Sequence, residues 1–81
     1  MNKRAETLEA MRNNPRDWRI EYLLVVAAQF GIECRNSGGS HHVFGCPGME
    51  ADVTVPAHRP IKPVYVRQFL LLVDAVKEIK K

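Results

Sequence analysis

The sequence lacks the marks of secreted and membrane proteins. Only two of its 81 residues are cysteines, too few for the disulfide framework of a small secreted domain. Its longest apolar run, 22–28, is much shorter than the roughly 20 residues that cross a bilayer. The charged N-terminus has no apolar signal segment. We therefore expect a cytoplasmic protein without a membrane-bound part, in which both thiols are reduced and buried.

Several cofactor motifs are also missing. The stretch "GGS" lacks the glycine fingerprints of dinucleotide and phosphate loops, and no G-x-S-x-G elbow of a serine hydrolase is present. There is no C-x-x-C pair. A zinc ion could be surrounded by Cys34, Cys46, His58 and one of the paired histidines, but their spacing matches no common zinc finger. The sequence thus predicts neither a cofactor nor a metal.

Acidic residues are absent between Val53 and Val73, although the net charge of the chain is only +3. Three cations, Arg59, Lys62 and Arg67, occur in that interval, with His58 beside them. A local positive surface of this kind suits a polyanion such as RNA, although three cations over such a length can also simply solvate a loop.

Apolar spacing predicts the helices of a single domain with 46% hydrophobic residues. A first helix is expected over 2–12. A second is expected from Asn14, as its N-cap, and Pro15 to Phe30; it is apolar nearly all round and should be the central core element. A last helix is expected over 64–80. Its predicted buried stripe consists of Val66, Phe69, Leu70, Val73, Val76 and Ile79.

Alternating polar and apolar residues predict three strands between the second and last helices, over 32–35, 40–46 and 52–55. The order is α-α-β-β-β-α. We expect a small α+β domain in which helices cover one face of a three-stranded antiparallel sheet and leave the other face free.

Two of the three histidines are adjacent, His41 and His42, directly after a glycine turn. Neighbouring side chains of a strand point to opposite faces, so His42 shares a face with the bulky Phe44. We expect that face to be the core side, which leaves His41 exposed; a bulge beside the turn would exchange the two.

An exposed histidine can transfer protons near neutral pH, because an unperturbed imidazole has a pKa of about 6.5. RNA carries its own nucleophile, the 2′-hydroxyl, so one histidine and a few cations suffice to cleave it. His41 is the candidate catalyst, and His42 is the second choice. The candidate RNA contacts are Gly39, Ser40, Arg59, Lys62 and Arg67.

The stretches "GGSHHVF" and "DVTVPAHRPIKPVYVRQFLLLVD" resemble the HicA toxins of bacterial toxin–antitoxin pairs, over about residues 18–74. Their signature is a glycine, a serine, a histidine, two variable residues and a large apolar residue. Here it reads Gly39, Ser40, His41, His42, Val43, Phe44. The resemblance implies a double-stranded-RNA-binding-domain-like fold, mRNA interferase activity, a catalytic His41, and a HicB-type antitoxin as partner.

The resemblance places a HicA-like domain at 15–81 and makes 1–14 an extra N-terminal helix, which could be a packing element, a dimer surface or an antitoxin contact. Two other functions remain open. One is an RNA-binding module without catalysis, and the other is a domain whose exposed surface only binds an antitoxin. Neither the RNA preference nor the oligomeric state follows from the sequence.

Overall fold

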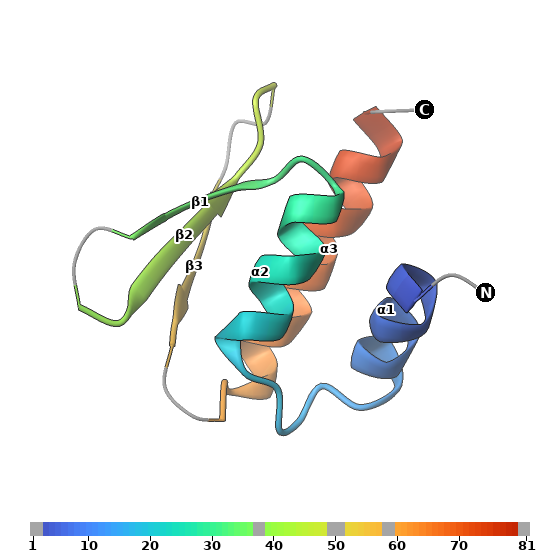
Figure 1. Cartoon of the computed structure of the whole chain (residues 1–81), viewed down its shortest axis with the longest axis vertical. Helices are drawn as coiled ribbons and strands as arrows, with labels where there is room; N and C mark the ends of the chain where they lie inside the picture. The colour runs from blue at the N-terminus through green and yellow to red at the C-terminus, as the bar shows by residue number, and fades with distance from the viewer. Residues whose placement is uncertain (1–2, 37–38, 49–51, 58–59, 80–81) are drawn as a thin grey trace.

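Three helices and three strands follow one another in the predicted order. The structure, a computed structural model, describes residues 3–36, 39–48, 52–57 and 60–79. Its elements are α1 (Lys3–Asn13), α2 (Ile20–Gln29), β1 (Glu33–Asn36), β2 (His41–Gly45), β3 (Val53–Pro56) and α3 (Pro63–Ile79). The strands form one sheet, and the helices lie on one side of it (Figure 1). The α+β prediction is confirmed.

The sheet is an antiparallel meander in the order β1-β2-β3. Phe44 pairs with Cys34 of β1 and with Val53 of β3, so β2 is the central strand. The Phe44 ring packs edge-on against Phe69 of α3, with 5.0 Å between the ring centres. The face that carries Phe44 therefore lies toward the helices, and we call the opposite face the outer face.

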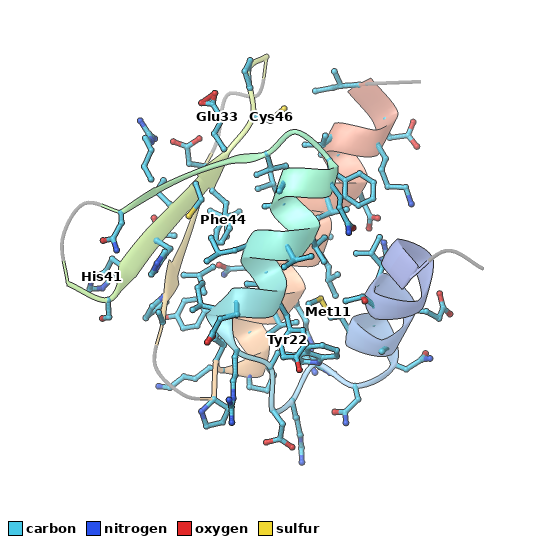
Figure 2. All side chains as sticks on the ribbon, in the orientation of Figure 1. Met11, Tyr22, Glu33, His41, Phe44 and Cys46 are labelled. Carbon is cyan, nitrogen blue, oxygen red and sulfur yellow. The ribbon has the colours of Figure 1, made fainter. Side chains whose placement is uncertain are left out.

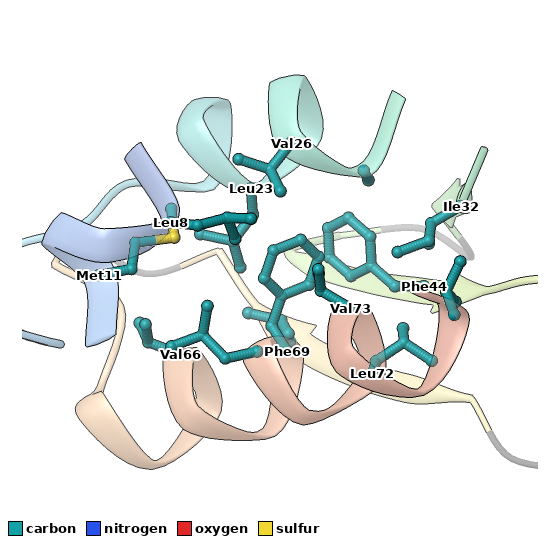
Figure 3. Close-up of a cluster of buried hydrophobic side chains, with 14 of the residues drawn as sticks. Leu8, Met11, Leu23, Val26, Ile32, Phe44, Val66, Phe69, Leu72 and Val73 are labelled. Atoms are coloured by element: carbon teal, nitrogen blue, oxygen red, sulfur yellow. The ribbon is translucent and has the colours of Figure 1, made fainter. Parts of the chain in front are cut away.

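One hydrophobic core joins all three helices to the sheet (Figure 3). The helix α3 contributes more buried residues than any other element, because apolar residues recur along one side of its 17 residues. Its buried residues are Val66, Phe69, Leu70, Leu72, Val73 and Val76. The predicted stripe is confirmed except at its end, where Ile79 is 52% exposed because it lies in the last turn. Among the described helices, none combines the length and apolarity needed to span a membrane.

The helix α2 is less central than its composition predicts. Leu23, Val26 and Ala27 are buried, but Tyr22 and Val25 are about half exposed. These two side chains leave the helix on the side opposite the core, since α2 packs on β1 and α1 along a single stripe. The helix contacts the sheet and another helix, but the expectation that it is the central core element is wrong, because α3 contributes more buried residues.

The start of α2 also differs from the prediction. The Asn14 side chain does not cap this helix; its Oδ1 instead accepts a hydrogen bond from the backbone N–H of Arg16 at 3.2 Å. The backbone carbonyl of Trp18 accepts a hydrogen bond from the N–H of Ile61 at 2.9 Å. This bridge to a distant segment holds the chain extended through Arg19, so α2 begins only at Ile20.

The first helix is a packing element of the same core. Leu8 and Met11 are buried beside the other helices, as Figure 3 shows. Arg12 forms an ion pair with Asp74 of α3, and the hydrogen bond to that carboxylate raises the pKa of the Arg12 guanidinium. Of the three roles considered for the N-terminal helix, packing is the one that these contacts support directly.

Candidate active site

The paired histidines stand at the beginning of β2, directly after a tight turn. Gly39 has φ 64°, a left-handed conformation that glycine adopts without steric cost. A Cβ at this position would contact nothing within 4 Å, so the backbone angle and not crowding favours glycine here. The carbonyl of Ser40 accepts a hydrogen bond from the N–H of Ala57 at 2.6 Å, which fastens the turn to the segment that leaves β3.

The two histidines face opposite sides of the sheet, as predicted. His41 is exposed on the outer face, and Figure 2 shows its ring at the edge of the molecule. His42 is half-buried on the face that carries the fully buried Phe44. Its Nδ1 lies 3.4 Å from the carbonyl oxygen of Ser40. The regular pairing of His41 with Pro56 and of His42 with Val55 shows that no bulge exchanges the two side chains.

The outer face around His41 is open and mostly polar. Val43 is the next outward residue of β2, and its neighbours across the sheet are Arg35 of β1 and Thr54 of β3. Arg35 is thus a cation on the same face as His41. It lies beside Val43, which is two residues after His41 in β2. Arg35 is not among the residues predicted for the site, although the alternation within 32–35 places it on the face opposite Cys34.

The Arg35 guanidinium is directed toward the end of the sheet that is remote from His41. Its Nη2 lies 2.9 Å from Oδ2 of Asp52. A Cβ on Gly45 would collide with the Asp52 carboxyl group, so glycine at this position leaves room for the ion pair. A depression here is lined by Glu33, Arg35, Gly45, Cys46, Pro47 and Asp52. Among the described residues, this end of the outer face carries both positively and negatively charged side chains, whereas the His41 end does not.

The three predicted cations do not form one cluster with His41 among the described residues. Lys62 is exposed just before α3, at the end of the connection that leaves β3 beside His41. Arg67 is exposed on α3 and lines a groove of the helical layer with Arg12, Leu70, Leu71 and Asp74. Arg59, like His58, lies outside the described residues. Along the chain, Lys62 follows the end of β3 that pairs with His41, whereas Arg67 lies in the helical layer and not on the outer face.

The two cysteines bear on the zinc alternative, because a thiolate would be a zinc ligand. Cys46 is buried and Cys34 is half-buried, and both thiols are free. Burial raises the pKa of the Cys34 thiol, which favours its neutral form. Within the described parts of the chain, no three His, Cys, Asp or Glu side chains gather as metal ligands would.

Comparisons with protein-family models, with curated proteins and with solved structures found no match to this chain. The resemblance to HicA toxins therefore rests on the motifs quoted above, and the candidate site rests on the position of His41.

Proposed function

We propose that this protein is an endoribonuclease of the HicA toxin type, which cleaves mRNA in the cytoplasm with His41 as its catalytic residue. The observation that carries the proposal is the placement of His41. Its imidazole stands exposed on the open face of the sheet, next to a glycine turn that lets a polymer backbone approach.

The chemistry needs no group beyond those of the RNA and the protein. His41 removes the proton of a ribose 2′-hydroxyl, and the resulting oxygen attacks the adjacent phosphorus. The bond from phosphorus to the 5′-oxygen breaks as the 2′-oxygen bond forms, which yields a 2′,3′-cyclic phosphate. The proton that His41 carries, or one from water, completes the 5′-hydroxyl of the leaving strand. The reaction is a transesterification that consumes no oxidant or cofactor.

The backbone around the turn would hold the scissile phosphate. Gly39 and Ser40 directly precede His41, so a phosphate near the imidazole also lies near their main chain. Lys62 would supply positive charge from the start of α3, with Arg59 in the segment before it. A HicB-type antitoxin that covers the outer face would block this surface in the inactive pair.

A second candidate, RNA binding without cleavage, is favoured by one observation. Within the described part of the chain, no hydrogen bond or ion pair orients the His41 ring. Arg35, a cation on the same face of the sheet, is engaged by Asp52. A binding module needs only the open face and the basic segment, and its affinity would fall steeply with salt. A domain that binds only an antitoxin would show no RNA affinity at physiological salt.

The purified protein is expected to cleave an RNA oligonucleotide in the presence of EDTA, because the 2′-hydroxyl is the nucleophile and histidine is the catalyst. The matched substrate has the same sequence with 2′-O-methyl groups at every ribose. It retains the charge and the base edges but has no free 2′-hydroxyl. We expect the protein to bind both oligonucleotides and to cleave only the first. Gel electrophoresis would detect the cleavage.

Three outcomes separate the candidates. Cleavage of both oligonucleotides would contradict attack by the 2′-hydroxyl. Binding of both without cleavage would support the RNA-binding module. Loss of cleavage in EDTA that returns with a divalent cation would favour metal-dependent chemistry.

A further inference from the structure

The edge of β3 that faces away from β2 presents backbone groups that no other described strand of the chain takes up. The N–H of Ala57 donates to the carbonyl of Ser40. Hydrogen-bonded pairs alternate along an antiparallel ladder, so His42 and Val55 form the next such pair. Phe44 and Val53 form the pair after that, and Thr54 lies between Val53 and Val55 on β3. Its N–H and C=O therefore point away from β2, toward the edge of the sheet.

A groove of about 370 Å³ runs between this edge and α3. One wall is formed by Asp52, Val53 and Thr54, and the other wall by Gln68, Leu71, Leu72 and Ala75. Leu71 is the most exposed large apolar side chain among the described residues, at 68%. A free strand edge and an exposed leucine thus border the same groove.

The other edge of the sheet, β1, differs in kind. Its sequence Glu33–Asn36 carries two charged residues, Glu33 and Arg35, which are typical of edge strands that avoid pairing. The sequence of β3, Val53–Pro56, carries no charge. Proline is found at strand edges because it has no N–H to donate, and here it limits pairing to the part of β3 before it. The edge of β3 is therefore the one suited to further pairing.

We propose that β3 pairs with β3 of a second copy of this chain, antiparallel, around a twofold axis at Thr54. The two Thr54 residues would exchange both of their outward backbone hydrogen bonds. Asp52 would lie opposite Pro56 of the other copy and donate its N–H to that carbonyl. Pro56 has no N–H to return to the Asp52 carbonyl of the other copy, so each end of the pairing has one hydrogen bond instead of two and the ladder stops there.

The exposed side of α3 is complementary to itself around the same axis. Leu71 and Thr54 line one groove, so Leu71 lies on the side of α3 that borders the edge of β3. Two antiparallel copies of α3 would bring their Leu71 side chains together over the paired strands. Arg67 precedes Leu71 by one helical turn and Asp74 follows it by nearly one turn, so each Arg67 would approach Asp74 of the other copy.

The result is a six-stranded sheet with every helix on one side. A twofold axis perpendicular to the sheet keeps both outer faces on the other side, so both His41 side chains would remain exposed. The proposal gives Arg67 a role in the interface, consistent with its place in the helical layer. It does not depend on RNA cleavage.

Sedimentation velocity of the purified chain is expected to show twice the monomer mass. One strand edge and one helix face make a small interface, so we expect a dissociation constant of about micromolar and measure up to about 0.1 mM. Leu71→Glu should give monomers, because it places two carboxylates together at the axis. The matched control is Val25→Glu on α2, which is 57% exposed but remote from β3 and should remain dimeric.

Circular dichroism would verify that both variants retain the fold, as expected for exposed positions. A wild-type chain that stays monomeric at the highest concentration would overturn the proposal, even if another protein bound the groove. Dimers that survive Leu71→Glu, or that are lost equally in Val25→Glu, would also overturn it.

Discussion

Replacement of His41 by alanine is expected to slow RNA cleavage by roughly 10²- to 10⁴-fold, the usual contribution of one general acid or base. RNA affinity should change little, because phosphate contacts come from other groups. The thermal midpoint should also stay close to that of the wild type, since His41 is exposed and its truncation opens no cavity. Single-turnover cleavage, RNA titration and thermal unfolding of the same preparation measure the three quantities.

His42→Ala is the matched control, because it removes the same side chain one residue along the same strand. His42 is half-buried on the helix side of the sheet, so its loss should affect stability more than cleavage. Equal loss of cleavage in both variants, or loss only in His42→Ala, would show that the catalyst has been assigned to the wrong histidine.

Phe44→Ala is expected to lower the free energy of unfolding by about 3–5 kcal/mol, as for other large aromatic residues removed from a core. Phe44 is fully buried in the central strand and packs edge-on against Phe69. Small domains have a total stability of about 5–15 kcal/mol, so the variant should be partly unfolded at 37 °C. Urea titration followed by circular dichroism gives the difference from the wild type.

Val43→Ala tests whether the stability lost in Phe44→Ala comes from the core or from a weaker strand β2. Val43 precedes Phe44 in β2 but points to the outer face and is half-buried. Its truncation should cost about 1 kcal/mol or less, since it removes little buried apolar surface. Similar losses in the two variants would contradict the assignment of the two faces of β2.

The elements and the faces of β2 could be predicted from the sequence because both depend on local patterns. Alternation in 40–46 was enough to separate His41 from His42, since Phe44 fixes the core side. The start of α2 could not be predicted in the same way. Asn14 and Pro15 favour a helix locally, but the backbone bridge between Trp18 and Ile61 joins segments far apart in sequence and overrides that preference.

The exposure of Tyr22 and Val25 was missed for a related reason. Apolar residues are not always buried, and composition does not reveal which side of a helix remains without a neighbour. Alternation along β1 gives the face of Arg35, but its position beside Val43 depends on the register of β1 against β2, which only the paired strands show. The position of Arg67 depends on which side of α3 packs on the core. Charge counted along the sequence could therefore not show that Arg67 lies in the helical layer and not on the outer face.

The chemical nature of the RNA ends produced in EDTA tests the central claim most directly, because it reports which oxygen attacks phosphorus. Mass spectrometry of the products should find a 2′,3′-cyclic phosphate, or the 3′-phosphate formed by its hydrolysis, on one fragment and a 5′-hydroxyl on the other. Fragments that end in a 3′-hydroxyl and a 5′-phosphate would show that water, and not the neighbouring ribose, is the nucleophile, and would contradict the role proposed for His41.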